Sequence, residues 1–254
     1  MAAVSEVSVP RLVGAAFVFQ FCTSLAAGLL SRSILSGDVG EVVGTAGDNA
    51  SPLRVVVVLE LATSIGIIAL ASLLYVALRG TIRWIATVAC ALWLAEASVL
   101  AVSMLGLYEL LDIGATDSAS PLGAPEAAVG GFAIGLHDHA ATIAMLFASV
   151  GALLWYSLFI RTRFVPAWLG IWGLASIALV GVATLMKVWD GAAQPPMLLY
   201  VAYMPFELVV GLWLLVRGSP GLRTTTEATA YEEPPPTETP TPVGAVHSGK
   251  PTSG

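Results

Sequence analysis

Apolar and polar positions divide this chain into segments of the length that crosses a membrane. Six long apolar stretches occupy most of the first 217 residues, and short polar segments separate them. Each stretch is near or above the roughly 20 residues that a helix needs to cross about 30 Å of hydrocarbon. We therefore predict an all-α polytopic membrane protein, a six-helix transmembrane bundle, with spans over residues 12–30, 55–78, 84–107, 129–160, 166–186 and 197–216.

The amino-acid composition also indicates a membrane protein. Hydrophobic residues make up 57% of the chain and charged residues 11%, and the mean hydropathy is +0.84. So few ionisable groups could not coat a soluble protein of 254 residues. The two cysteines, Cys22 and Cys90, both fall inside apolar spans, where a thiol behaves as a small hydrophobe. We predict no disulfide framework.

The basic residues near the ends of the spans predict the orientation. If the chain crosses the membrane six times, seven of these basic residues lie on one side of the membrane and three on the other. Basic residues favour the cytoplasmic side. We therefore expect a protein of the cell membrane with both termini in the cytoplasm. The seven are Arg11, Arg79, Arg83, Arg161, Arg163, Arg217 and Arg223, and the three are Arg32, Arg54 and Lys187.

The connections and the C-terminal segment differ from the spans in composition. Residues 31–52 and 108–128 are rich in Gly, Ser, Asp and Pro, and are predicted to be surface loops. Residues 218–254 contain Pro, Thr and Glu and almost no apolar residue that could drive burial. We therefore divide the chain into a six-span transmembrane domain, 1–217, and a disordered cytoplasmic tail, 218–254.

Small residues at four-residue spacing predict where the helices approach closely. The fourth span carries such a row, and the second span carries Ala62 and Gly66. Helices in lipid associate through small residues that let their backbones touch, and an intramolecular packing seam is favoured over a dimer interface. The row consists of Ala140, Ala144, Ala148 and Ala152.

Ionisable side chains inside the spans are the candidates for function. An ionised side chain at the centre of a span costs about 2.5–3.5 kcal/mol, so such groups usually face the bundle interior or a wet cavity. Glu96 and Glu207 lie near the middle of the third and sixth spans, and Glu60 lies closer to the outer boundary. We hypothesise that Glu96 and Glu207 share one interior cavity, with Glu60 and His137 nearer its outer mouth.

His137 and His139 raise the alternative of a metal site. Residues two apart on a helix point about 200° from each other, so the two histidines would be joint ligands only if the helix began after them. A polar cluster at the start of the fourth span is the preferred interpretation. The chain has no HExxH, no CxxC and no glycine-rich phosphate loop, so we assign no catalytic residue, and the cofactor is unknown.

Pro205 predicts a local interruption of the sixth span. A proline inside a helix removes a backbone donor and crowds the carbonyl four residues earlier, here that of Val201. The helix should open two residues before Glu207.

Several short motifs stand in a recognisable order over about residues 11–218. They are Arg11-Leu12-Val13-Gly14, Leu74-Tyr75-Val76, Ala95-Glu96-Ala97, His137, Tyr156, Arg161, Pro166, Leu169-Gly170, Phe206-Glu207-Leu208, Leu212-Trp213-Leu214-Leu215 and Gly218. Their order resembles that of a bacterial multi-pass membrane family, catalogued as domain of unknown function 4386. The turn before Pro166 departs from it, because Thr162-Arg163-Phe164-Val165 stands where the family usually has Ser-Gly-Tyr. The resemblance implies a six-span helical protein and brings no known reaction or substrate.

Three classes of function are compatible with these patterns. The first is a binding or transport role for a proton, cation or small solute in a polar intramembrane cavity. The second is a structural or accessory membrane subunit without its own substrate, and the third is a membrane-embedded hydrolase. We expect the lipid bilayer and a small solute or ion as partners, and no nucleic acid. The sequence leaves the oligomeric state open.

Overall fold

The structure is a computed structural model that describes residues 8–116, 123–191, 195–196 and 198–220. Its ordered elements in these residues are all α-helices, which confirms the predicted fold class. Of the tail predicted over residues 218–254, residues 221–254 lie outside the described residues. The helices are α1 (Val9–Leu35), α2 (Val39–Gly44), α3 (Ala50–Leu78), α4 (Arg83–Thr116), α5 (Ala124–Thr162), α6 (Ala167–Trp189), α7 (Leu198–Val201) and α8 (Tyr203–Arg217).

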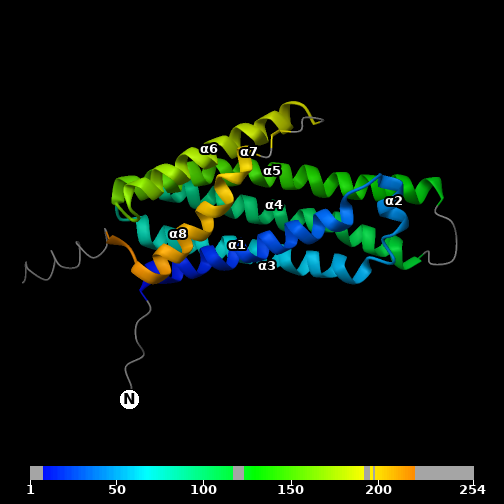
Figure 1. The fold of residues 1–254 in the computed structure, drawn as a ribbon, viewed down its shortest axis with the longest axis horizontal. Helices are drawn as coiled ribbons and strands as arrows, with labels where there is room; N and C mark the ends of the chain where they lie inside the picture. Colours follow the sequence, from blue (N-terminus) through cyan, green and yellow to red (C-terminus); the bar gives the residue numbers. More distant parts are fainter. Residues whose placement is uncertain (1–7, 117–122, 192–194, 197, 221–254) are drawn as a thin grey trace, which may run out of the picture.

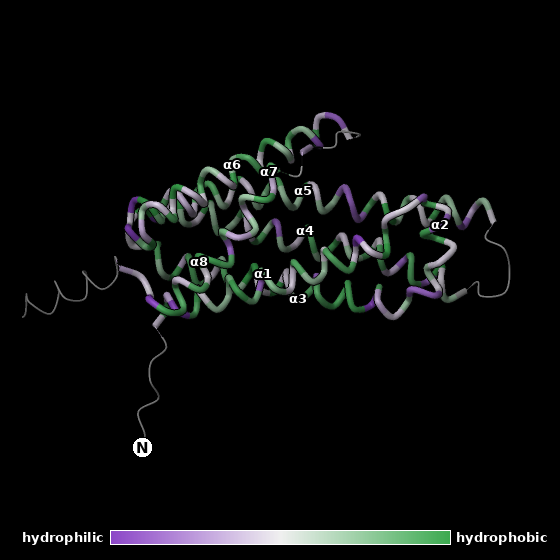
Figure 2. Tube along the Cα trace, viewed as in Figure 1, coloured by the Kyte–Doolittle hydropathy of each residue, from purple (hydrophilic) through white to green (hydrophobic). Residues whose placement is uncertain are grey.

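The described part of the chain contains six helical segments that are long and apolar enough to cross a membrane. They are α1, α3, α4, α5, α6 and the pair α7–α8, and each coincides with one predicted span. Figure 2 shows hydrophobic residues along most of every helix, whereas hydrophilic residues gather mainly in the connections and toward the end of the bundle near α2. The protein is therefore a multi-pass membrane protein.

The helices pack mostly against their neighbours in the chain. Helices α1, α3, α4 and α5 lie side by side, α6 packs on α5, and α8 crosses back to pack on α1 (Figure 1). The start of α1, the α3–α4 and α5–α6 connections and the end of α8 lie at one end of the bundle, which we call the terminal end. Helix α2 lies at the opposite end, which we call the α2 end.

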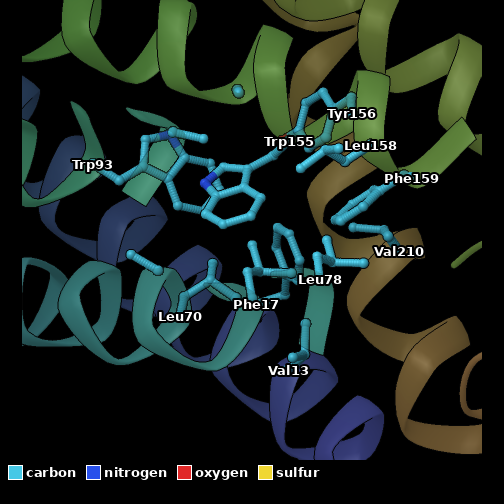
Figure 3. Packing of buried hydrophobic residues seen from close by; sticks show 14 of the residues in the cluster. Val13, Phe17, Leu70, Leu78, Trp93, Trp155, Tyr156, Leu158, Phe159 and Val210 are labelled. Atoms are coloured by element: carbon cyan, nitrogen blue, oxygen red, sulfur yellow. The ribbon is translucent and has the colours of Figure 1, made fainter. Parts of the chain in front are cut away.

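Aromatic side chains fill the core in the half of the bundle toward the terminal end. Trp155, Tyr156 and Phe159 of α5 are fully buried, as is Phe17 of α1 (Figure 3). Trp93 of α4 lies against Trp155, with ring centroids 6.0 Å apart. Lipid tails are as apolar as these side chains, so close packing, more than the hydrophobic effect, holds the helices together.

The small residues predicted to form packing seams do lie between helices. A Cβ atom on Gly66 of α3 would lie 3.1 Å from Phe19 and 3.4 Å from the Gln20 Cβ of α1. In the alanine row of α5, the backbone carbonyl of Ala148 accepts a hydrogen bond of 3.2 Å from Trp93 Nε1. Both seams are therefore intramolecular, as predicted.

The prediction of loops over residues 31–52 and 108–128 is wrong for much of both segments. α1 continues to Leu35, α4 continues to Thr116, and α2 forms inside the first segment. The apolar residues of α2 pack against the end of α4 in a small core with Leu53 and Ile113. This core of Val42, Val43, Ala46, Leu110 and Leu111 lets the helices extend beyond the roughly 20 residues that the bilayer requires.

The sixth span is interrupted close to Pro205, as predicted. Helix α7 ends at Val201, Ala202 is a turn, and α8 begins at Tyr203. The indole Nε1 of Trp172 on α6 donates a hydrogen bond of 3.1 Å to the carbonyl of Ala202. The interruption is thus stabilised by a neighbouring helix, which is how broken helices satisfy their backbone groups inside membranes.

The α5–α6 turn contains a residue with a positive φ angle. Arg163 has φ 53°, a left-handed conformation that favours glycine and costs about 1–2 kcal/mol in other residues. Its backbone nitrogen donates to Ile160, and that of Phe164 donates to Phe159, which forms a Schellman motif. The turn therefore holds Arg163 in a conformation that glycine adopts most readily.

Candidate functional site

Four helices bring five polar side chains together in the half of the bundle toward the terminal end. The Tyr203 hydroxyl donates a hydrogen bond of 2.8 Å to Oε1 of Glu207, and the Tyr156 and Tyr203 hydroxyl oxygens lie 3.2 Å apart. The side chain of Gln20 also hydrogen-bonds the Glu207 carboxylate. We call this group, with Glu96, the carboxylate cluster; it consists of Gln20 of α1, Glu96 of α4, Tyr156 of α5, and Tyr203 and Glu207 of α8.

Local geometry explains why Gln20 and Tyr203 reach Glu207. Tyr203 and Glu207 are four residues apart, so they lie on one face of α8. α1 and α8 run in opposite directions and touch at two glycines, where a Cβ atom on Gly14 would lie 2.7 Å from the carbonyl oxygen of Gly211. About one and a half turns farther along α1, Gln20 faces the turn of α8 that carries Glu207.

Glu96 completes the cluster from α4. It is half-buried, and its carboxylate lies close enough to the Glu207 carboxylate and the Tyr156 hydroxyl to interact with them electrostatically. Glu96 is about 20 Å along its helix from the terminal end, and Glu207 about 15 Å, at 1.5 Å per residue. The two depths differ by about 5 Å.

No basic side chain of the described residues accompanies the two carboxyl groups of the cluster. Glu207 interacts with Tyr203 and Gln20, and Glu96 interacts with Glu207. Neither carboxylate interacts with a lysine or arginine of the described residues. Two like charges held close together in a low dielectric repel strongly, so such a pair favours holding a proton or another cation.

Aromatic side chains of α5, α6 and α8 cover the cluster on the side of α6. Phe206 is fully buried, and its ring lies 4.9 Å from that of Tyr156 and 5.9 Å from that of Trp172. Gly173 of α6 lies directly against the Phe206 ring, where a side chain would collide with it. These rings keep the surroundings apolar, which strengthens every electrostatic interaction of Glu207.

Glu60 and His137 form a second pair, nearer the α2 end. Glu60 Oε1 lies 3.8 Å from His137 Nε2, and their side chains are 13% and 7% exposed. Glu60 Oε2 and His137 Nδ1 are buried and have no hydrogen-bond partner. Each unsatisfied buried polar atom costs about 1–3 kcal/mol. The α4 and α5 backbones touch beside this pair, since Gly106 contacts Ala133.

The structure does not bring the two histidines together as metal ligands. α5 runs without a break from Ala124 to Thr162, so His137 is buried while His139 is exposed and contacts the carbonyl of Gly135 one turn earlier. Among the described residues, no three His, Cys, Asp or Glu side chains form a group that could hold a metal ion. The joint metal hypothesis therefore has no support in this geometry.

The four cavity candidates thus separate into two pairs, Glu96 with Glu207 and Glu60 with His137. Sequence reasoning did not assign Gln20 or Tyr203 to the site, and noted Tyr156 only as a motif residue. An amide inside the first apolar stretch and a tyrosine one turn from Glu207 were the available signals. A shallow surface groove lies at the α3–α4 connection and contains none of these residues. Its lining is Thr81, Ile82, Arg83, Trp84, Thr87 and Val88.

Comparison with known proteins gives a family. No curated protein and no solved structure is significantly similar to the chain. The family model described as "Domain of unknown function (DUF4386)" matches residues 12–218, which include both pairs of candidate residues and all six spans except the first three residues of α1. The suspected resemblance is confirmed, and the chain belongs to this family of proteins with a domain of unknown function.

Proposed function

We propose that the protein binds a proton or a small cation between Glu96 and Glu207 inside the membrane, in a binding or transport role. The observation that carries the proposal is the approach of two carboxylates from α4 and α8 without a lysine or arginine beside them among the described residues. A bound proton or cation would remove the repulsion between them.

Two further features support binding. Tyr203 and Gln20 hold one carboxylate in place, which fixes the geometry of the pair. The interruption of the sixth span at Ala202 lies about one turn from Glu207. Many membrane transporters form their ion sites beside such discontinuous helices, because the unwound carbonyl groups and the helix ends can coordinate the ion.

A structural role is the second candidate, and the same hydrogen bonds favour it. A carboxylate that accepts from a tyrosine hydroxyl of its own helix and from a glutamine of α1 ties two helices together. In that case Glu96 and Glu207 would stabilise an accessory subunit without a ligand of their own. Hydrogen bonds between helices in a membrane typically contribute about 0.6 kcal/mol each.

Ligand binding can be tested on the protein purified in detergent. We expect either a melting temperature that rises with one of Li⁺, Na⁺ or K⁺, or about one more proton taken up near neutral pH than by Glu207→Gln. A ligand that binds only the folded state stabilises it by about 2.7 kcal/mol at 100 times its Kd. Thermal unfolding and potentiometric titration measure the two effects.

The matched control is Glu126→Gln, since Glu126 is exposed in the first turn of α5. It should keep the response of the wild type, and Glu207→Gln should lose it. If the wild type and Glu207→Gln respond identically to every cation and take up the same number of protons, the binding proposal fails and the structural role remains.

We further propose that the terminal end faces the cytoplasm of a cell membrane. The described basic residues support this orientation six to three, with Arg223 outside the described residues. Reporter fusions placed after Arg79, Arg161 and Gly218 should therefore all report the cytoplasm. An external signal from the fusion after Arg161 would contradict the proposed topology.

A further inference from the structure

The terminal end of the bundle carries a concentrated positive charge. Six of the described basic residues lie there, and the acids nearest to them along the described helices, Glu96 and Glu207, are about 15–20 Å deeper. Membrane surfaces contain negatively charged phospholipids, and clusters of arginine beside a span attract them. The six are Arg11, Arg79, Arg83, Arg161, Arg163 and Arg217.

Two of these arginines are held beside each other by Tyr75 of α3. The guanidinium carbon of Arg79, at the end of α3, lies 6.0 Å from the centroid of the Tyr75 ring, which is a cation–π distance. Arg83 and Thr87 of α4 form side-chain hydrogen bonds with the Tyr75 hydroxyl. Both arginines are exposed, and a guanidinium group has five N–H donors, more than one tyrosine takes up.

The groove at the α3–α4 connection begins beside this pair and leads toward lipid. Thr81 and Arg83 form its polar part. Trp84 and Val88, which are 67% and 43% exposed, lie one turn apart on one face of α4 and form its apolar part. Tryptophan favours the boundary between headgroups and hydrocarbon, and Val88 lies about 8 Å deeper than Arg83. The groove therefore presents donors and then apolar surface, the order in which a phospholipid carries its phosphate and its acyl chains.

We propose that Arg79, Arg83 and this groove bind the headgroup of an anionic phospholipid from the leaflet at the terminal end. The planar guanidinium group matches a phosphate group with two parallel hydrogen bonds, and the charges of the two strengthen them. A headgroup with a net negative charge is preferred over phosphatidylcholine, whose quaternary ammonium group would lie near two positive side chains. This site is separate from the one between Glu96 and Glu207, and its occupation does not depend on what that site binds.

The test is fluorescence quenching of the protein in uncharged detergent by phosphatidylglycerol with brominated acyl chains. Bromine quenches tryptophan on contact, and the part of the quenching that is missing in Trp84→Phe belongs to Trp84. Brominated phosphatidylglycerol should reach half of this quenching at a concentration about 25-fold lower than brominated phosphatidylcholine, about 5-fold for each arginine. Arg79→Gln and Arg83→Gln should each raise that concentration about 5-fold and leave the phosphatidylcholine curve unchanged.

Arg161→Gln is the matched control, because it removes the same charge from an exposed position at the same end of the bundle. It should keep the wild-type curve for Trp84. A loss as large as that in Arg83→Gln would indicate diffuse attraction by the whole basic end and would overturn the site. Equal quenching by the two lipids in the wild type, or unchanged curves in both Arg79→Gln and Arg83→Gln, would overturn it as well.

Inorganic phosphate tests whether a lipid is the ligand. At the concentration of phosphatidylglycerol that gives half of the quenching, it should not displace the lipid, because it lacks the acyl chains that contact Trp84 and Val88. Displacement would identify a site for free phosphate and contradict the proposal. The Arg79→Gln and Arg83→Gln variants should keep the cation or proton response that depends on Glu207, so failure of one proposal leaves the other standing.

Discussion

Replacing Gly14 by leucine should lower the melting temperature of the protein by roughly 10 °C. A Cβ atom at this position would lie 2.6 Å from the Leu215 backbone nitrogen and 2.7 Å from the Gly211 carbonyl oxygen. Both atoms belong to the backbone of α8, so the helices must move apart. Overpacking of this kind costs about 3 kcal/mol, and each kcal/mol shifts the melting temperature of a protein of this size by about 2–4 °C. Tryptophan fluorescence during heating in detergent measures the change.

The same helix offers a matched control. Gly28 of α1 is exposed, and a Cβ atom there would meet no other atom within 4 Å. Gly28→Leu makes the same chemical change and adds helix propensity, so its melting temperature should match or exceed that of the wild type. Equal, large losses in both variants would show that α1 is sensitive to leucine everywhere, and the contact with α8 would then not explain the effect.

This contact also matters for the site, because it places Gln20 opposite Glu207. A shift of α1 away from α8 would lengthen the hydrogen bond between their side chains. Gly14→Leu should therefore weaken ligand responses as well as stability. The glycine belongs to the Arg11-Leu12-Val13-Gly14 motif on which the resemblance to the family partly rested.

The apolar pattern predicted the spans well for a physical reason. A helix in hydrocarbon must satisfy its backbone internally, so length and hydropathy alone determine where it can cross. The same reasoning failed outside the bilayer. Leu110 and Leu111 extend α4 because they pack against Val42 and Val43 of α2. Hydropathy averaged along the sequence carries no information on such a tertiary contact.

The candidate site was predictable only in part. An ionisable residue inside a span is easy to recognise, because placing its charge in hydrocarbon costs free energy. This identified Glu60, Glu96 and Glu207 as candidates. Their partners are tyrosine, glutamine and histidine, and such residues also occur in spans without any special role. The pairing of Glu60 with His137 depends on how far α3 and α5 are rotated toward each other, and the sequence does not state a rotation. The helical period showed that His137 and His139 face apart, but did not show which one is buried.

The last expectation concerns the coupling between Glu96 and Glu207. When two titratable groups interact by more than about one pK unit, their protons bind in two steps that belong to the pair. The wild type should therefore show two steps in an infrared titration of its buried carboxyl groups. Glu96→Gln and Glu207→Gln should each leave a single step, whose midpoint lies about one unit or more from the wild-type step in which the other carboxylate is already charged, because that like charge is gone.

Independence of the two groups would give a different outcome. Glu109→Gln, which removes an exposed acid of α4, should leave both steps in place and serves as the control on that helix. If removing Glu96 leaves the titration of Glu207 unchanged, the two carboxylates do not share a proton. The hydrogen bonds from Tyr203 and Gln20 would then be sufficient to explain why Glu207 is buried, and the structural role would take precedence over binding.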